Sequence, residues 1–155
     1  MPDKKIKHYT DTLHYDLELT AKYTKTLGMQ ICEKFHSDVP LDCIVALDTI
    51  SCNSGICQRD LAKLILKDRA NTGRLLDLLE KTGYIERYND TKNNRLVRKM
   101  EVTEEGKKFL QKITDEFLPI QANIDTIITP GEEKLVRDIL KKLREGIENL
   151  IEKQI

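Results

Sequence analysis

The sequence has no tryptophan, and aromatic residues occupy only 5% of its 155 positions. Glycine and proline are also scarce, with seven and four residues respectively. Few strand-forming aromatics and few turn residues favour helices over sheets, so we expect a mostly α fold. A chain of this length can bury a sufficient core without disulfide or metal staples. One domain that covers residues 1–155 is therefore the simplest expectation.

Long apolar runs are missing as well. No segment approaches the roughly 18 apolar residues that a membrane-spanning helix needs, and no apolar stretch follows the lysines of the N-terminus. We therefore expect a cytoplasmic protein without a membrane partner. Its four cysteines are too few to indicate a secreted disulfide framework.

The cysteines leave two local alternatives open. Cys52 and Cys57 could form a disulfide around a short polar turn, or they could be small buried thiols. Cys32 and His36, four residues apart, could share a metal ion, but no second ligand pair completes a zinc site. We expect no metal and no cofactor.

Recognisable catalytic motifs are absent. The sequence contains no Gly-rich phosphate loop, no nucleophile elbow and no complete set of metal ligands, and its three histidines all precede residue 37. The sequence therefore argues against an enzyme.

The net charge of zero conceals an uneven distribution. Residues 58–100 carry eleven Lys and Arg against six Asp and Glu, a net charge of +5, so the rest of the chain carries −5. A basic middle between acidic arms is typical of a protein that touches phosphate groups with one face only.

Hydrophobic spacing predicts helices in the first half of the chain. A long helix is expected at about 7–36 and a short one from Leu41, ending in the polar stretch 51–55. A further short helix around Leu61 is followed by a helix that Asp68 caps and Gly83 ends. Two such helices with a tight connection indicate a helix-turn-helix.

A β-hairpin and two long helices are predicted to follow. Residues 84–88 and 96–102 have the pattern of strands, with a polar loop at 89–94. Thr103 should cap a fifth helix, kinked or broken near Pro119. Thr129 and Glu132 form a capping-box start for a sixth helix, whose apolar stripe reaches Ile151.

Three motifs resemble those of the MarR family of bacterial and archaeal regulators. They are Asp60-Leu61-Ala62, the stretch RLLDLLEKTGYIER at 74–87, and VTEEG at 102–106. The resemblance implies a winged helix-turn-helix at 41–102 flanked by dimerisation helices at 7–36 and 103–155. It also implies a homodimeric transcription regulator, a repressor, that binds a pseudo-palindromic operator in double-stranded DNA. Many members bind a small aromatic or anionic effector that releases them from DNA.

The helix after Asp68 is the expected recognition helix. A helix in the major groove presents its N-terminal turns to base edges. Gly73 weakens this helix by about 1 kcal/mol relative to Ala, which a close approach to DNA or to another helix would explain. The DNA contacts expected in this helix are Arg69, Asn71, Thr72 and Arg74.

The hairpin and the first helix supply further candidates. Lys92, Arg95 and Arg98 are expected to reach phosphates or the minor groove. The tip reads Asn93-Asn94-Arg95 where the family commonly has Asp-Arg-Arg, so an acidic partner for the wing arginine is missing. His14, Tyr15 and Tyr23 could line an effector cleft, although aromatic residues of a long helix also pack in cores.

Three features of the pattern have a second interpretation. Basic residues on a helix or in a loop can be solvated charges without a partner. The apolar stripes of the first and last helices fit either a dimer or an intramolecular core. A winged-helix domain can also serve as a protein interaction module, in which case the basic face has no DNA partner.

Overall fold

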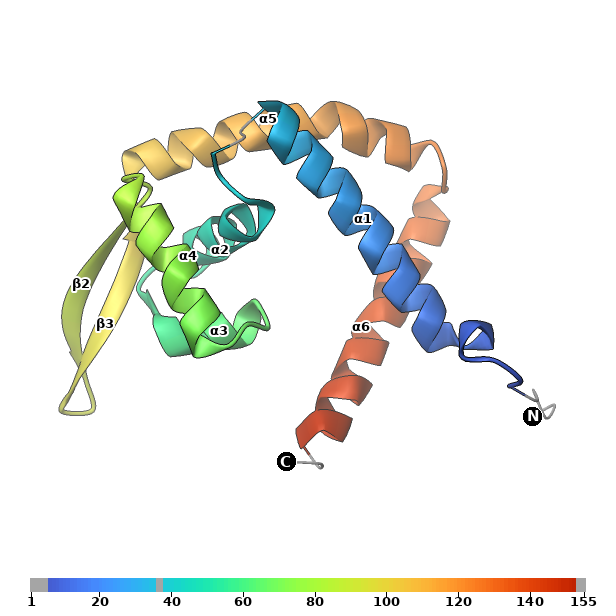
Figure 1. Ribbon diagram of the computed structural model, residues 1–155, viewed down its shortest axis with the longest axis horizontal. Coiled ribbons are helices and arrows are strands. Elements are labelled where there is room, and N and C mark those ends of the chain that lie inside the picture. Colours follow the sequence, from blue (N-terminus) through green and yellow to red (C-terminus); the bar gives the residue numbers. More distant parts are fainter. Residues whose placement is uncertain (1–5, 36–37, 153–155) are drawn as a thin grey trace. The chain divides into compact units, whose positions relative to one another are not determined.

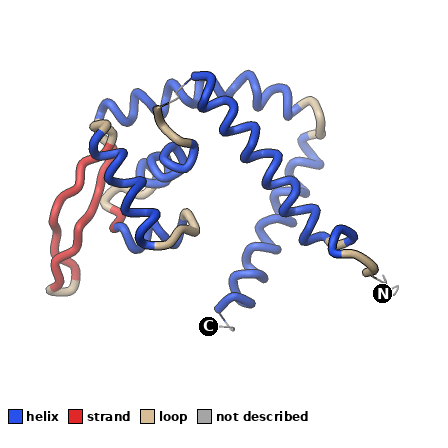
Figure 2. Tube along the Cα trace, in the orientation of Figure 1, coloured by secondary structure: helices blue, strands red, loops and turns tan. Residues whose placement is uncertain are grey.

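The computed structural model describes residues 6–35 and 38–152 (Figures 1 and 2). The chain divides into two compact units, residues 1–111 and 112–155, and α5 passes from the first into the second. The mostly α fold with a β-hairpin is confirmed. The elements are α1 (Leu13–Phe35), α2 (Leu41–Cys52), β1 (Ile56–Cys57), α3 (Gln58–Leu64), α4 (Arg69–Lys81), β2 (Ile85–Lys92), β3 (Arg95–Val102), α5 (Glu104–Asp125) and α6 (Pro130–Glu152).

Helix α1 begins later than the sequence pattern predicts. A 3₁₀ turn at Tyr9–Asp11 precedes it, and Thr12 is extended. The Thr12 hydroxyl then accepts a hydrogen bond from the backbone N–H of Tyr15, 3.2 Å away, as an N-cap residue does. Further along, a Cβ added to Gly28 would lie 3.0 Å from the side chain of Leu41, so α1 approaches α2 closely at that point.

The core of the first unit lies where α2, α3 and α4 meet the sheet. Helix α2 is apolar on most of its surface, as expected for a helix covered on several sides. The side chains that are at most 2% exposed come from all of these elements. They are Cys43, Ala46, Leu47, Ile50, Leu61, Thr72, Leu76, Leu79, Ile85 and Met100.

Helices α3 and α4 end in the same way. In each, the residue after the C-cap has a positive φ, and two backbone N–H groups close back onto the last turn, which is a Schellman motif. In α4 this residue is the predicted Gly83, with φ +78°. In α3 it is Leu66, with φ +51°, a conformation that strains a residue with a side chain.

The sheet has three antiparallel strands in the order β1-β3-β2. The strand β1, which the sequence pattern missed because it is only two residues long, pairs Ile56 with Met100. The predicted loop at 89–94 is wrong, because β2 continues to Lys92. Only Asn93 and Asn94 form the turn, with φ +52° and +58°, as a type I′ hairpin turn requires.

Helix α5 begins against the sheet of the first unit. The ring of Phe109 stacks on that of Tyr84, with centroids 4.5 Å apart. Gly106 faces the backbone of the same segment, since a Cβ added there would lie 2.2 Å from the Tyr84 carbonyl oxygen. Of the kink or break predicted near Pro119, the break is wrong, because α5 continues through Pro119 to Asp125, and the kink stays a prediction.

Helix α6 begins as predicted. The Thr129 hydroxyl accepts a hydrogen bond from the backbone N–H of Glu132, 3.3 Å away. In return, the Glu132 carboxylate accepts one from the backbone N–H of Thr129 at 2.8 Å. These two bonds form the predicted capping box and satisfy two N–H groups at the helix start.

The cysteines are all free thiols. Cys52 is exposed and Cys57 is half-buried, so neither the local disulfide nor the fully buried pair is found. Cys32 is buried, and His36, with which it could share a metal ion, lies outside the described residues. Within the described ranges, no helix has the length and hydropathy needed to cross a membrane.

Candidate nucleic-acid interface

The cap at the start of α4 fixes the direction in which this helix leaves the turn. The Asp68 carboxylate accepts a hydrogen bond from the backbone N–H of Asn71 at 2.8 Å. This backbone bond, with the added bond from the Asn71 side chain, lowers the pKa of Asp68 below its ordinary value. The carboxylate is therefore ionised at neutral pH and lies at the positive end of the helix dipole.

Three of the four predicted contacts in α4 are exposed. Arg69 and Arg74 are open to solvent and show no ion pair among the residues that the structure describes. Asn71 is exposed too, but its side-chain amide donates to the Asp68 carboxylate, so one of its donors already has a partner. The arrangement leaves two free cations on the N-terminal half of α4.

Thr72 is the exception, and the prediction that its side chain faces DNA is wrong. It is 0% exposed, and its hydroxyl donates to the backbone carbonyl of Asp68. The reason is helical spacing, because Thr72 lies four residues before Leu76 and seven before Leu79 on the buried face. This 4-3 spacing was visible in the sequence and would have placed Thr72 in the core.

Gly73 approaches a neighbouring helix. Its nearest non-local neighbour is the side-chain amide of Gln58 at the start of α3, 3.4 Å from the position of an added Cβ. The same amide nitrogen lies 3.3 Å from the backbone carbonyl oxygen of Arg69 and donates to it. Gln58 thus joins α3 to the first turn of α4, and Gly73 leaves room for this contact.

The tip of the hairpin presents Arg95 to solvent. Lys92 and Arg95 are the last paired residues on either side of the turn. Arg95 is exposed and shows no ion pair in the described parts of the chain. The side chain of Lys92 lies outside what the structure describes.

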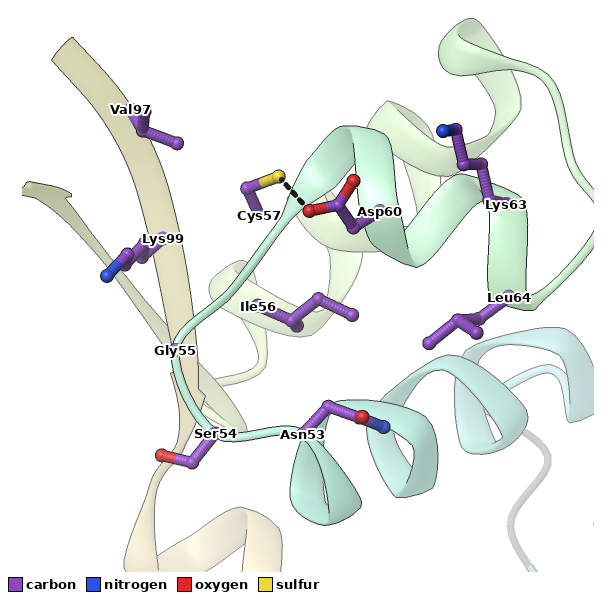
Figure 3. A pocket seen from close by; sticks show the side chains of 10 residues that line it. All are labelled: Asn53, Ser54, Gly55, Ile56, Cys57, Asp60, Lys63, Leu64, Val97 and Lys99. Carbon is purple, nitrogen blue, oxygen red and sulfur yellow. Dashed lines mark hydrogen bonds between the residues drawn. The ribbon is translucent and has the colours of Figure 1, made fainter. Parts of the chain in front are cut away.

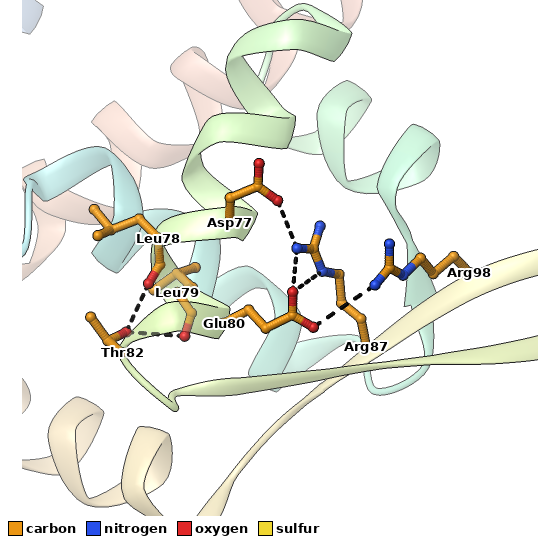
Figure 4. Close-up of polar contacts among 7 residues, drawn as sticks. All are labelled: Asp77, Leu78, Leu79, Glu80, Thr82, Arg87 and Arg98. Atoms are coloured by element: carbon orange, nitrogen blue, oxygen red, sulfur yellow. Dashed lines mark hydrogen bonds and ion pairs between the residues drawn. The ribbon is translucent and has the colours of Figure 1, made fainter.

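The third predicted wing residue, Arg98, lies nearer the base of the hairpin. Its guanidinium is 4.0 Å from the Glu80 carboxylate of α4, and its side chain is 60% exposed. Beside it, Arg87 of β2 binds both Glu80 and Asp77 (Figure 4). These bonds raise the pKa of Arg87, with Glu80 the larger cause, and the Arg87 guanidinium lowers the pKa of Glu80.

Arg87 was not among the predicted site residues. The sequence did contain a signal for it, because Asp77 and Glu80 are three residues apart and share one face of α4. The strand pairing that brings Arg87 to this face could not be read from the sequence.

A pocket of about 500 Å³ opens between α3 and the sheet (Figure 3). The thiol of Cys57 lies 3.2 Å from the Asp60 carboxylate, to which it donates. Lys99 is paired with Asp90, with 2.5 Å between nitrogen and oxygen. The lining residues are Asn53, Ser54, Gly55, Ile56, Cys57, Asp60, Lys63, Leu64, Val97 and Lys99.

The predicted effector residues lie elsewhere, on α1, and only two of them gather together. The rings of His14 and Tyr15 each lie 5.8 Å from that of Tyr9, between centroids. Tyr23 is 71% exposed and makes no ring contact within the described ranges. The pocket described above includes none of them.

Comparison with known proteins identifies the region that holds this interface. Residues 43–97, from α2 to the middle of β3, match the family model described as "MarR family". This segment of the chain is therefore similar to the MarR family. The family assignment inferred from the three sequence motifs is thereby confirmed.

Named relatives agree with this assignment. The HTH-type transcriptional regulator PrsX of Escherichia coli is 37% identical over 75 residues, which are 48% of this chain and 45% of PrsX. YybA of Bacillus subtilis, named as an uncharacterized HTH-type transcriptional regulator, is 30% identical over 62% of this chain and 63% of its own length. The chain thus matches about half of PrsX and less than two thirds of YybA. Both belong to a non-enzymatic class, as expected for this protein.

A solved structure extends the likeness in fold. The crystal structure of the Staphylococcus aureus MepR–DNA complex superposes with a TM-score of 0.73 and 22% sequence identity. The match covers 88% of this chain and 98% of MepR. At this identity the likeness establishes the fold.

Proposed function

We propose that this protein is a sequence-specific DNA-binding transcription regulator. The observation that carries the proposal is the two-sided construction of α4. One face, with Thr72, Leu76 and Leu79, is buried, while Arg69 and Arg74 extend from the N-terminal half into solvent. A rigidly packed helix with exposed arginines at its start is the geometry that reads base edges in the major groove.

The likeness to MepR supports this proposal, since its solved structure contains DNA. Arg95 at the wing tip is suited to a phosphate or minor-groove contact. Asn71 remains a candidate base contact through the part of its amide that Asp68 does not engage. Lys92, whose side chain is not described, stays a predicted contact.

We further propose that the regulator acts as a homodimer on a pseudo-palindromic operator. Large apolar side chains of α6 are exposed, and most of them recur at helical spacing along one face. Such a face is expected to pack against another apolar surface. A second copy of the chain supplies the same face by two-fold symmetry. The exposed residues are Leu135, Val136, Ile139, Ile147, Leu150 and Ile151.

Repression and release by a small aromatic or anionic effector complete the proposal. The cluster of Tyr9, His14 and Tyr15 offers aromatic surface and one imidazole ring to such a molecule. A panel of aromatic carboxylates should include one that dissociates the protein from its DNA, and His14→Ala with Tyr15→Ala should reduce that response. If no compound of the panel acts, the effector part of the proposal is contradicted.

The main proposal is tested by selecting fragments of the source genome that the protein binds, at several salt concentrations. A specific reader keeps a preferred fragment as salt rises, whereas a protein interaction module shows no preferred fragment. Arg74→Ala should weaken binding to that fragment by about 1–3 kcal/mol. The matched control is Lys81→Ala, which removes one positive charge from the last turn of the same helix and should change affinity little.

Dimer formation is tested by charge substitution on α6. Ile139→Glu combined with Ile147→Glu should give a folded monomer in sedimentation measurements, because two carboxylates would be buried without partners. Lys141→Glu, an exposed change on the same helix, should leave the dimer intact. A dimer that survives both apolar substitutions contradicts the assignment of α6.

A further inference from the structure

We infer that Arg87 is a positioning residue that fixes the angle of the wing hairpin against α4. This allows Arg95 at the tip and the N-terminal half of α4 to contact the same DNA. The inference rests on the proposed function. It also reassigns Arg98, which the sequence indicated as a DNA contact, to the support of the wing.

The contacts of Arg87 join two elements at defined atoms. Its Nε donates to Glu80 Oε2 at 2.9 Å, and its Nη2 donates to Asp77 Oδ1 at 2.6 Å and also to Glu80 Oε2. Figure 4 shows the guanidinium of the strand between the two carboxylates of the helix. Because the carboxylates come from neighbouring helical turns, the planar guanidinium is held at two points and cannot rotate freely.

Burial makes these bonds hard to exchange for water. The side chain of Arg87 is only 10% exposed, while Asp77 is 71% and Glu80 is 38% exposed. A buried guanidinium without its carboxylates would lose solvation with no compensation. The Arg87 guanidinium therefore remains bound to α4, and this bond holds β2 against the helix.

Charge balance explains the role of Arg98. Two carboxylates, Asp77 and Glu80, face two guanidinium groups, and Arg98 shares Glu80 with Arg87. The attraction of Glu80 draws Arg98 towards α4, from the neighbouring strand of the same hairpin. The second strand of the wing thus adds a longer and more exposed ion pair to the same helix.

These ion pairs lie far from the tip of the hairpin, so a small change of angle at Arg87 moves the tip by a large distance. Arg87 pairs with Met100, and the hairpin extends five more residue pairs to Lys92 and Arg95. At about 3.3 Å per residue, the tip lies about 17 Å beyond Arg87, so a tilt of about 10° would move it by about 3 Å. That displacement equals the length of a hydrogen bond to phosphate.

Little else supports the outer part of the hairpin. Leu96 is 76% exposed, and Tyr88, Asn89 and Thr91 are also open to solvent. The strand β1 pairs with β3 only at Met100 and Lys99, near the base. Among the described residues, the direct polar ties between the wing and α4 are those of Arg87 and Arg98.

Coupling between Arg87 and Arg95 tests the inference. The affinity for the selected genomic fragment is measured for the wild type, Arg87→Met, Arg95→Ala and the double variant. Met retains much of the volume of Arg87 and removes its bonds. If Arg87 acts by positioning the wing, Arg95→Ala should weaken wild-type binding roughly tenfold but the Arg87→Met protein by less than about twofold. The slope of log affinity against log salt should fall by about 1 in each single variant and no further in the double variant.

Each alternative outcome has a separate meaning. Equal effects of Arg95→Ala in both backgrounds would make Arg87 merely structural and overturn the inference. An Arg95→Ala variant that binds like the wild type would overturn it too, since the wing would have no contact to position. A wild-type protein that prefers no fragment would contradict the proposed function itself.

A second variant keeps the inference testable if Arg87→Met does not fold. Asp77→Ala removes one anchor from an exposed position and leaves Arg87 bound to Glu80. It should fold, with a thermal transition close to that of the wild type, and should show the same loss of coupling in smaller degree. Full additivity with Arg95→Ala in this background would also count against positioning.

Discussion

The hydroxyl of Thr72 lies 2.8 Å from the backbone carbonyl oxygen of Asp68, to which it donates a hydrogen bond. The same carbonyl also accepts the backbone N–H of Thr72 at 3.0 Å. A residue in the first turn of α4 is thus directed inward, onto the turn that precedes it. A substitution at Thr72 should therefore lower stability and leave DNA affinity unchanged. A substitution at Arg74 should lower DNA affinity and leave stability unchanged.

Replacing Thr72 with Val should lower the free energy of unfolding by about 1 kcal/mol, because it removes one buried hydrogen bond and nearly keeps the shape. The affinity of the folded protein for its DNA fragment should stay the same. Urea denaturation and a binding titration measure the two quantities. A large loss of affinity at unchanged stability would place the Thr72 hydroxyl on DNA after all.

Gly106 should tolerate no side chain. An added Cβ would lie 2.2 Å from the Tyr84 carbonyl oxygen and 2.7 Å from Val102 Cγ1, and backbone cannot easily move away. We expect Gly106→Ala to lower the free energy of unfolding by more than about 2 kcal/mol. Gly146→Ala is the matched control, because nothing lies within 4 Å and Ala favours the helix by about 1 kcal/mol. Equal thermal shifts for the two variants would refute the steric explanation.

Leu66 carries backbone strain that glycine would relieve. It has a φ of +51° and is 91% exposed, so its side chain contributes almost no burial. Relief of about 1–2 kcal/mol is partly offset by the greater entropy of glycine in the unfolded chain, so Leu66→Gly should stabilise the fold by up to about 1 kcal/mol. Leu64→Gly, two residues earlier in α3, should destabilise it instead. Denaturant melts that rank the two variants in the reverse order would contradict this account.

Asp42 should contribute stability that acid removes. Its carboxylate lies 2.9 Å from Lys67 Nζ and 3.8 Å from Lys25 Nζ. The first ion pair joins α2 to the turn between α3 and α4, and the second joins α2 to α1. The hydrogen bond from Lys67 is the largest cause that lowers the pKa of Asp42 below its ordinary value of 3.8. The folded state therefore holds its proton less tightly than the unfolded state. The contribution is complete above about pH 4 and is lost as the pH falls through the lower, folded pKa.

Asp42→Asn should accordingly be less stable than the wild type at pH 7, by no more than about 1 kcal/mol because the Asp42 side chain is 38% exposed to solvent. The difference should shrink below about pH 4. Asp48→Asn serves as the control, since Asp48 is exposed on the same helix and shows no ion pair in the described part of the chain. A difference that grows on acidification would give the wrong sign and exclude the ion pair as its source.

Local signals in the sequence predicted the helix ends well. The Asp68 cap, the left-handed Gly83 and the capping box of Thr129 and Glu132 are all confirmed. Each depends on atoms within four residues of one another, so the sequence alone contains the whole interaction. The prediction of the hairpin loop was less accurate, because the length of the turn at Asn93 and Asn94 depends on pairing between the two strands.

The sequence by itself determined the mostly α class, the winged helix-turn-helix and the exposed arginines of α4, because helical spacing and capping are local properties. Only the tertiary structure decided that Gly106 lies against Tyr84 and that Arg87 reaches Asp77 and Glu80. These outcomes depend on which surfaces of distant segments meet. Contacts and ion pairs between distant segments arise from packing, and the local propensities of a sequence do not predict them.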